Sequence, residues 1–326
     1  MNSEITQSKI DTFIFSGGGP SFFTILGNIQ HLETVKYIDI HAIKKIYATS
    51  SGSISALFFC LHKDLGFDWD TIQQYIIGRP WQTLFPMNIE NILDAYQNRG
   101  LFGIHEFQQI FSPFFALKNI PLDITLQSFY ETICPIELHF CAIDVNQYKL
   151  EDISRFTYPN MQLFQAIQST CAIPMIFQPV LYENKAFMDG GLILNYPVKL
   201  WMENYKDTLA SNSTSSLESS SADNTETSIE SFDTILGFKN KYNSEEFVGK
   251  KTFVSENSTL FDYILTLCFR IIVHLEDNTK IQIPHELVNE TDFMSHELIL
   301  QALNSKDKRA ELIEKGRANA QTFLYS

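Results

Sequence analysis

One serine near the start of the chain lies in a turn whose neighbours suit a catalytic nucleophile. Ser50 is central in ATSSGS (residues 48–53), which follows an apolar, strand-like run and precedes a helical pattern. A serine between a strand and a helix is typical of the G-x-S-x-G nucleophile elbow, whose tight bend lifts the hydroxyl above a sheet edge. Ala48 replaces the first glycine and Gly52 supplies the second. The pattern predicts that Ser50 is a nucleophile; a small-residue turn without chemistry is the alternative.

A serine nucleophile needs a base that removes its proton. Asp189 follows the strand-like run AFM and precedes Gly190 and Gly191, so its carboxylate can lie at a sheet edge with little crowding. An ordinary Asp-Gly turn is the alternative interpretation. A histidine-dependent hydrolase is also open, because three histidines follow in the order of a Ser-Asp-His enzyme, although each is more typical of a surface or packed residue: His274, His285 and His296. We expect Asp189 to be the base.

Three glycines form a second turn between a strand-like run and a helical pattern. Gly17, Gly18 and Gly19 do not complete a dinucleotide fingerprint, because Phe22 stands where the third glycine is required. They do not form a phosphate-binding loop either, because the required Gly-Lys pair is missing. Glycines before a helix expose backbone amides, and the helix N-terminus adds a partial positive charge. We therefore expect the three glycines to form an oxyanion hole.

The elements that must position these residues alternate between strand and helix. Such alternation predicts an α/β fold with a largely parallel sheet, in a three-layer α/β/α arrangement. Strands are expected over residues 11–16, 44–49, 137–143, 233–238 and 281–284, and helices after both small-residue turns, over residues 165–173 and through the tail from 292 to 324. Residues 67–130 are mostly helical in pattern.

One segment interrupts this pattern. Residues 207–231 are rich in Ser and Thr and carry five acidic residues without a Lys or Arg. Such a composition buries too little apolar surface to offset the entropy of ordering. We expect a disordered, dispensable surface insertion in one catalytic domain, whose first part covers residues 11–206 and whose remainder covers residues 232–326.

Bulk composition limits the class of protein. The chain has 326 residues and a formal net charge of −14, which argues against nucleic acid as a partner. It has neither an apolar run long enough to span a membrane nor a signal-like N-terminus. The five cysteines form no CxxC pair, which favours a reducing compartment. We expect a cytoplasmic protein, with peripheral membrane association left open, and neither a metal nor a cofactor.

Four motifs, in their order along the chain, resemble the patatin-like phospholipase family: SGGG (16–19), ATSSGSI (48–54), STCAIPMIFQPV (169–180) and MDGGLILNYP (188–197). That family pairs an elbow serine with the aspartate of an Asp-Gly-Gly/Ala motif and uses no histidine. Carried over, the resemblance implies that Ser50 is the nucleophile, Asp189 the base and Gly17–Gly19 the oxyanion loop, with Gly52, Gly190 and Gly191 supporting the turns.

The resemblance also implies the activity. A hydrolase of the phospholipase A or lysophospholipase type would cleave a phospholipid or lysophospholipid at a transient membrane surface, through an acyl-serine intermediate. The oligomeric state is left open.

The glycine loop departs from the family's usual GGGx[RK]G. Ser21 replaces the basic residue and Phe22 replaces the following glycine. Phe22 either packs in the core or lines the acyl site. The departure keeps a second function open, in which a patatin-like protein with weak or no activity binds lipid or a protein partner.

Overall fold

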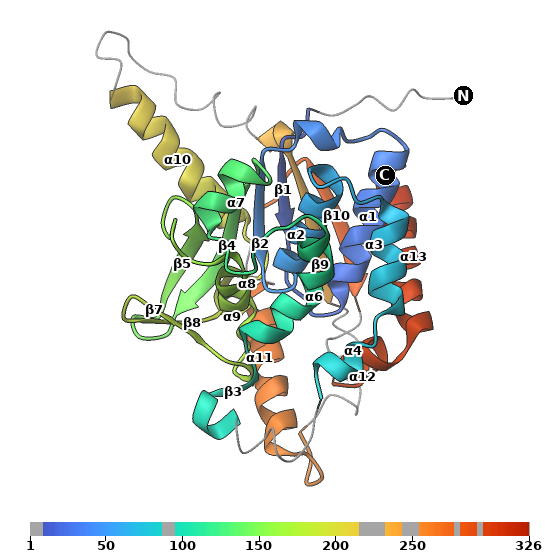
Figure 1. Ribbon diagram of the computed structural model, residues 1–326, viewed down its shortest axis with the longest axis vertical. Coiled ribbons are helices and arrows are strands. Elements are labelled where there is room, and N and C mark those ends of the chain that lie inside the picture. The colour runs from blue at the N-terminus through green and yellow to red at the C-terminus, as the bar shows by residue number, and fades with distance from the viewer. Residues whose placement is uncertain are drawn as a thin grey trace.

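A mostly parallel sheet of eight strands lies at the centre of the computed structural model, which describes residues 9–86, 95–214, 232–242, 254–276, 281–291 and 296–325 (Figure 1). Seven strands follow one another across the sheet in the order β10 (His285–Thr291), β9 (Ile235–Tyr242), β1 (Thr12–Phe15), β2 (Lys45–Thr49), β4 (Glu137–Asp144), β8 (Lys185–Asp189) and β7 (Val180–Tyr182). The eighth, β5 (Lys149–Ser154), pairs with β4. The first five are parallel, whereas β5 and β8 run antiparallel to β4.

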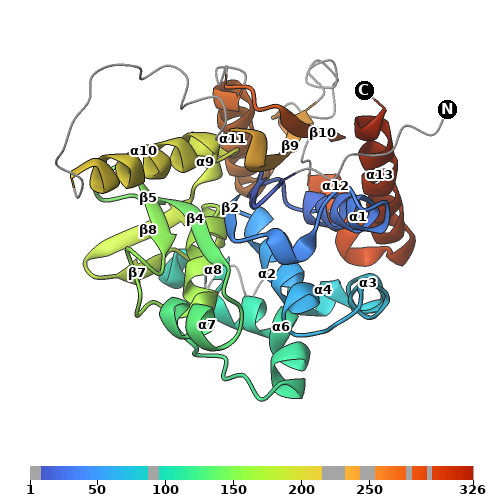
Figure 2. The ribbon, with the colours of Figure 1, turned by 90° about the horizontal axis from the view of Figure 1, so that it is seen from above.

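Helices cover both faces of the sheet, as the view from above shows (Figure 2). The alternation of side chains along β1 explains the two layers, because Phe13 and Phe15 join one apolar cluster and Ile14 joins another. One layer contains α1 (Ser21–Thr34), α2 (Gly52–Lys63), α3 (Trp69–Gly78), α6 (Ile104–Leu117), α7 (Leu126–Thr132), α8 (Leu163–Cys171) and α13 (Lys306–Leu324). The other contains α9 (Gly191–Leu194), α10 (Val198–Thr214) and α11 (Leu260–Glu276). The predicted three-layer α/β/α fold is therefore confirmed.

Shorter elements complete the described chain. They are α4 (Trp81–Leu84), α12 (His296–Asn304), the 3-10 helices Ile40–Ala42 and Phe232–Thr234, and a separate pair of parallel strands, β3 (Gly100–Phe102) and β6 (Met175–Phe177). No helix in this part of the chain has the length and apolar composition needed to cross a membrane.

The end of the sheet differs from the sequence prediction at one strand. The stretch 281–284 was expected to be a strand, but β10 begins only at His285. Pro284 lacks the backbone N–H that a paired strand donates, which explains why pairing starts after it. The predicted C-terminal helical tail is two helices, and the Ser305 hydroxyl caps the second by accepting a hydrogen bond from the Lys308 amide at 3.1 Å.

The acidic segment falls mostly outside the described residues. Helix α10 continues to Thr214, so the backbone of residues 207–214 is helical, and residues 215–231 are not described. The division into two parts of one domain with a dispensable insertion stays a prediction.

Strand β4 brings two distant strand ends together. One edge of β4 pairs with β5, and β2 and β8 both pair with the other edge. Thr49, the last residue of β2, lies opposite Cys141, and Asp189, the last residue of β8, lies opposite Ala142. Because Cys141 and Ala142 are consecutive, β2 and β8 approach each other end to end along β4.

Candidate active site

Ser50 occupies the bend between β2 and α2. Its φ angle is +52°, a left-handed conformation that is uncommon for a residue with a side chain and costs roughly 1–3 kcal/mol. Contacts elsewhere in the fold hold the bend. The Ser50 amide donates to Thr170 Oγ1 at 2.8 Å, and this hydroxyl donates to the Cys141 carbonyl at 2.5 Å. The two bonds tie the bend to α8 and β4.

Asp189 lies directly against Ser50. The Ser50 hydroxyl donates a hydrogen bond of 2.6 Å to Asp189 Oδ2, and the Gly191 amide donates one of 2.7 Å to Asp189 Oδ1. Asp189 is only 1% exposed. The following glycine is required by space, because a Cβ at Gly190 would lie 2.2 Å from the Cys141 carbonyl oxygen. The sequence-predicted pair is therefore brought into direct contact.

The surroundings of Asp189 change its acidity. Burial raises the pKa of its carboxyl to about 7, and the hydrogen bonds from Ser50 and Gly191 lower the pKa less than burial raises it. A carboxyl with a pKa near neutrality can both accept a proton and return it at physiological pH. The arrangement can therefore activate a serine hydroxyl without a histidine.

The three glycines have different partners. The Gly17 amide donates to the Asn195 carbonyl at 3.2 Å, so it is already used within the fold. Among the described residues, the amides of Gly18 and Gly19 donate to no protein group. Gly19 has a φ of +53° and lines the same cavity as Ser50. Of the predicted oxyanion donors, Gly18 and Gly19 keep their amides available.

Asn240 of β9 binds the glycine loop through its side chain. Its side-chain amide donates to the Gly17 carbonyl at 2.8 Å and to Ser21 Oγ at 2.7 Å. A second asparagine, Asn195, also donates to the Gly17 carbonyl, at 3.3 Å. Ser21 thus takes part in ordering the loop through a neutral hydrogen bond, at the position where a basic residue was expected.

Ser50 opens onto an apolar cavity of about 160 Å³. Apart from Ser50, Ser51 and Cys171, the residues that line it are Gly19, Pro20, Phe22, Phe23, Ile54, Trp81, Phe85, Phe102, Phe107, Ile110, Ile173, Ile176, Phe177, Leu265, Phe269, Ile299, Leu300, Ala302 and Leu303. Phe22 belongs to this wall and also to the adjoining core cluster. The lining suits an acyl chain, because it offers apolar contacts and few partners for a polar group.

The histidine alternative finds no support in the geometry. His285, the first residue of β10, shares a hydrogen bond of 2.8 Å between its Nδ1 and the Tyr37 hydroxyl, and neither residue lines the cavity. His274 lies on α11 and is not among the residues that line the cavity, and the side chain of His296 lies outside the described part of the chain. No described histidine lines the cavity.

Three supporting residues were not identified from the sequence. Thr170 and Asn195 lie within motifs that were recognised, but no role was assigned to either. Asn240 lies in an unremarkable strand, FKNKY, and its link to the loop spans 223 residues. Only the proximity of β9 to β1 in the folded sheet reveals it.

Comparison with known proteins identifies the family of the chain. The family described as patatin-like phospholipase matches residues 13–201, which is more than half of the chain. An uncharacterized protein, R571, from Acanthamoeba polyphaga mimivirus is 24% identical over 206 residues, covering 63% of this chain and 66% of that protein. A probable lipid hydrolase, 463L, from Invertebrate iridescent virus 6 is 26% identical over 191 residues, covering 58% of this chain and 62% of that protein. In each case the match spans slightly less than two thirds of the relative's length.

A solved structure shares the fold. The crystal structure of VipD from Legionella pneumophila superposes with a TM-score of 0.50 at 13% identity, over 97% of this chain and 67% of VipD.

Proposed function

The chain belongs to the patatin-like phospholipase family, and from this premise we propose that it is a lipid acyl hydrolase with Ser50 and Asp189 as its catalytic dyad. One observation carries the proposal: the hydrogen bond of 2.6 Å between Ser50 Oγ and a buried carboxylate, at the wall of an apolar cavity. A serine hydroxyl is weakly nucleophilic until a base accepts its proton. Asp189 is the group placed to do so.

The first half-reaction would form an acyl-serine. Ser50 Oγ attacks the ester carbonyl carbon while its proton passes to Asp189 Oδ2. The tetrahedral intermediate then collapses, the bond to the leaving oxygen breaks, and Asp189 returns the proton to that oxygen. The alcohol leaves, and the acyl chain stays bound to Ser50.

The second half-reaction would release the fatty acid. Water attacks the acyl carbon while Asp189 accepts one of its protons, and collapse of this intermediate returns that proton to Ser50 Oγ. In both halves the negative charge on the former carbonyl oxygen needs hydrogen-bond donors. We assign this role to the amides of Gly18 and Gly19, because the Gly17 amide is already bonded to Asn195.

The proposed substrate is a phospholipid or lysophospholipid. The cavity supports the acyl part, since its wall is apolar. The 463L relative is named a probable lipid hydrolase, which agrees with this class.

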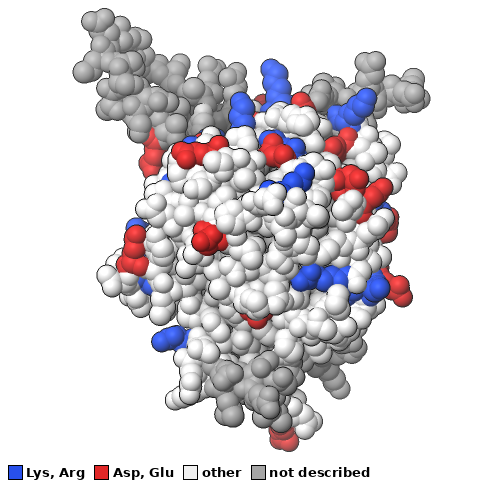
Figure 3. All heavy atoms as spheres, viewed as in Figure 1, with Lys and Arg blue, Asp and Glu red and all other residues white. Residues whose placement is uncertain are grey.

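Helix α11 supports contact with a lipid surface. Leu265 and Phe269 on one side of it line the cavity, while the opposite side exposes an apolar stripe of Leu260, Tyr263, Leu267, Ile271 and Leu275. A lipid surface against this stripe would bring acyl chains beside the cavity. The contact would rest on apolar burial, because the stripe itself is built from apolar and aromatic side chains. The opposite face of the molecule, seen in Figure 3, carries acidic and basic side chains mixed together, mainly in its upper half. Leu267→Asp should lower activity on vesicles and leave activity on a soluble ester unchanged; an equal loss on both would reject the contact.

A fluorophosphonate probe tests the dyad. The probe should label wild type at Ser50, and folded Ser50→Ala should not be labelled. Absence of labelling in folded wild type would favour the second function, a protein that binds lipid or a partner without hydrolysis.

A further inference from the structure

Phe22 lines the cavity onto which Ser50 opens. It lies in the first turn of α1, three residues after Gly19, and it lines the same cavity as Gly19 and Ser50. Its side chain is 6% exposed. An acyl chain that starts at Ser50 and fills this cavity therefore meets the aromatic ring of Phe22 in the wall.

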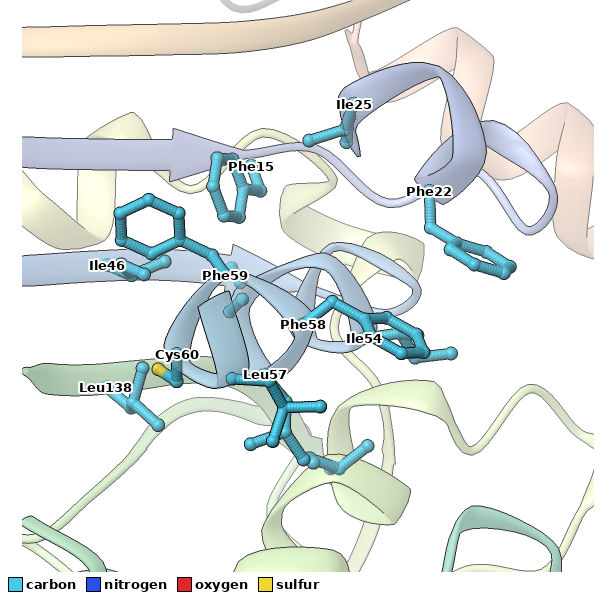
Figure 4. Packing of buried hydrophobic residues seen from close by; sticks show 14 of the residues in the cluster. Phe15, Phe22, Ile25, Ile46, Ile54, Leu57, Phe58, Phe59, Cys60 and Leu138 are labelled. Carbon is cyan, nitrogen blue, oxygen red and sulfur yellow. The ribbon is translucent and has the colours of Figure 1, made fainter. Parts of the chain in front are cut away.

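Other aromatic rings hold the Phe22 ring in place. The centroid of the Phe22 ring lies 4.0 Å from the ring centroid of Phe23 and 5.7 Å from that of Trp81. The ring of Phe58 is stacked on it at a centroid distance of 6.5 Å. Trp81 is fixed by a hydrogen bond of 2.7 Å from its indole N–H to the Ile76 carbonyl. Figure 4 shows the Phe22 ring projecting from α1 toward the side of α2 that carries Phe58. The ring therefore cannot swing aside without displacing buried neighbours.

The cavity can distinguish between acyl chains mainly by how much of their apolar surface it buries. Ser50, Ser51 and Cys171 are the polar or thiol side chains among its described lining residues. Each methylene group that gains or loses burial changes binding about fourfold. Because a fixed ring limits how many methylene groups the cavity can bury, binding should depend on the length of the acyl chain.

We propose that Phe22 limits the length of the acyl chain that the cavity accepts, so that the protein prefers esters of short and medium acyl chains. This inference rests on the proposed function, in which Ser50 cleaves acyl esters. Removal of the ring enlarges the cavity for longer chains, and a larger ring reduces the space further.

The test compares kcat/KM for p-nitrophenyl butyrate, octanoate, laurate and palmitate. Relative to wild type, Phe22→Ala should raise the palmitate-to-octanoate ratio about tenfold or more, and Phe22→Trp should lower it. Phe129→Leu is the matched control, because Phe129 is a buried ring that packs against Phe115 and does not line the cavity. Its ratio should stay within about twofold of wild type. If Phe22→Ala and Phe22→Trp change all four esters by the same factor, the length limit is rejected.

A binding measurement separates this inference from the proposed function. Fatty acids of the same four lengths displace a fluorescent fatty acid from Ser50→Ala, with and without Phe22→Ala, and no turnover is required. Palmitate should gain affinity over octanoate only when the ring is absent. If wild type cleaves esters but neither ratio moves, the length limit fails alone. If no ester is cleaved but the binding preference shifts, the hydrolase proposal fails and the length limit stands.

Discussion

Ser50 and Asp189 share a hydrogen bond of 2.6 Å although 139 residues separate them in the chain. Strand β4 produces this contact, because Thr49 and Asp189 lie opposite its consecutive residues Cys141 and Ala142. Backbone pairing thus fixes the contact between Ser50 and Asp189, and a flexible side chain is not needed to reach across the site.

The pH dependence of hydrolysis should follow Asp189. Only its ionised form accepts the Ser50 proton, and burial raises its pKa to about 7. We expect kcat/KM on a soluble ester to rise with pH and to level off above a midpoint near 7. A midpoint in the ordinary carboxylic acid range would show that Asp189 is not the base that limits the reaction.

The same carboxyl should make folding depend on pH. Its pKa is higher in the folded protein than in the unfolded chain, so its stabilising effect is fully present at low pH and is lost as the pH rises through about 7. Above that pH, the buried charge costs up to roughly 4 kcal/mol.

Asp189→Asn removes this cost while keeping an acceptor for the Gly191 amide. The Tm of the variant minus the Tm of wild type should therefore be larger at pH 8 than at pH 5. Thermal unfolding at the two pH values measures it. An unchanged difference between the two proteins would contradict the buried, ionisable carboxyl.

Gly18→Ala should abolish most activity while leaving the fold intact. A Cβ at Gly18 would lie 2.5 Å from Ser21 Oγ and 2.7 Å from Asn240 Nδ2, so the methyl group would disturb the contacts that order the loop. Loss of one oxyanion donor costs about 10²–10³ in kcat. Gly78→Ala is the control, because a Cβ there meets nothing within 4 Å. Equal activity of the two variants would remove the glycine loop from the mechanism.

Thr170→Val should impair both stability and turnover. The change leaves the Ser50 amide and the Cys141 carbonyl without the hydroxyl that they share, at a cost of roughly 1–3 kcal/mol per buried group. We expect a lower free energy of unfolding and a kcat reduced by about tenfold or more. Thr170→Ser keeps the hydroxyl and should retain most of both. If the serine variant is as impaired as the valine variant, the hydroxyl is not what positions Ser50.

Local patterns were enough to predict the contact between Ser50 and Asp189, because the turns that carry them need small residues. Gly190 tolerates no Cβ beside the Cys141 carbonyl, and Gly52 would bring one within 2.9 Å of the Phe15 carbonyl. Close approach of this kind leaves a recognisable signature in the sequence. The alternating strands and helices in turn predicted the layers that carry the two turns.

The supporting contacts could not be predicted in the same way. Asn240 and Thr170 are ordinary polar residues, and their roles depend on β9 lying beside β1 and α8 lying beside β2 and β4. The start of β10 was missed for a related reason, because a short apolar run does not show where pairing begins.

Hydrolysis of acyl esters by the Ser50–Asp189 pair can be measured on lipid substrates. It is tested most directly by fatty acid release from mixed phospholipid and lysophospholipid vesicles, comparing wild type, Ser50→Ala and Asp189→Asn, all shown to be folded. We expect release by wild type and a loss of about 10³-fold or more in each variant. Release by either variant at the wild-type rate would contradict this expectation.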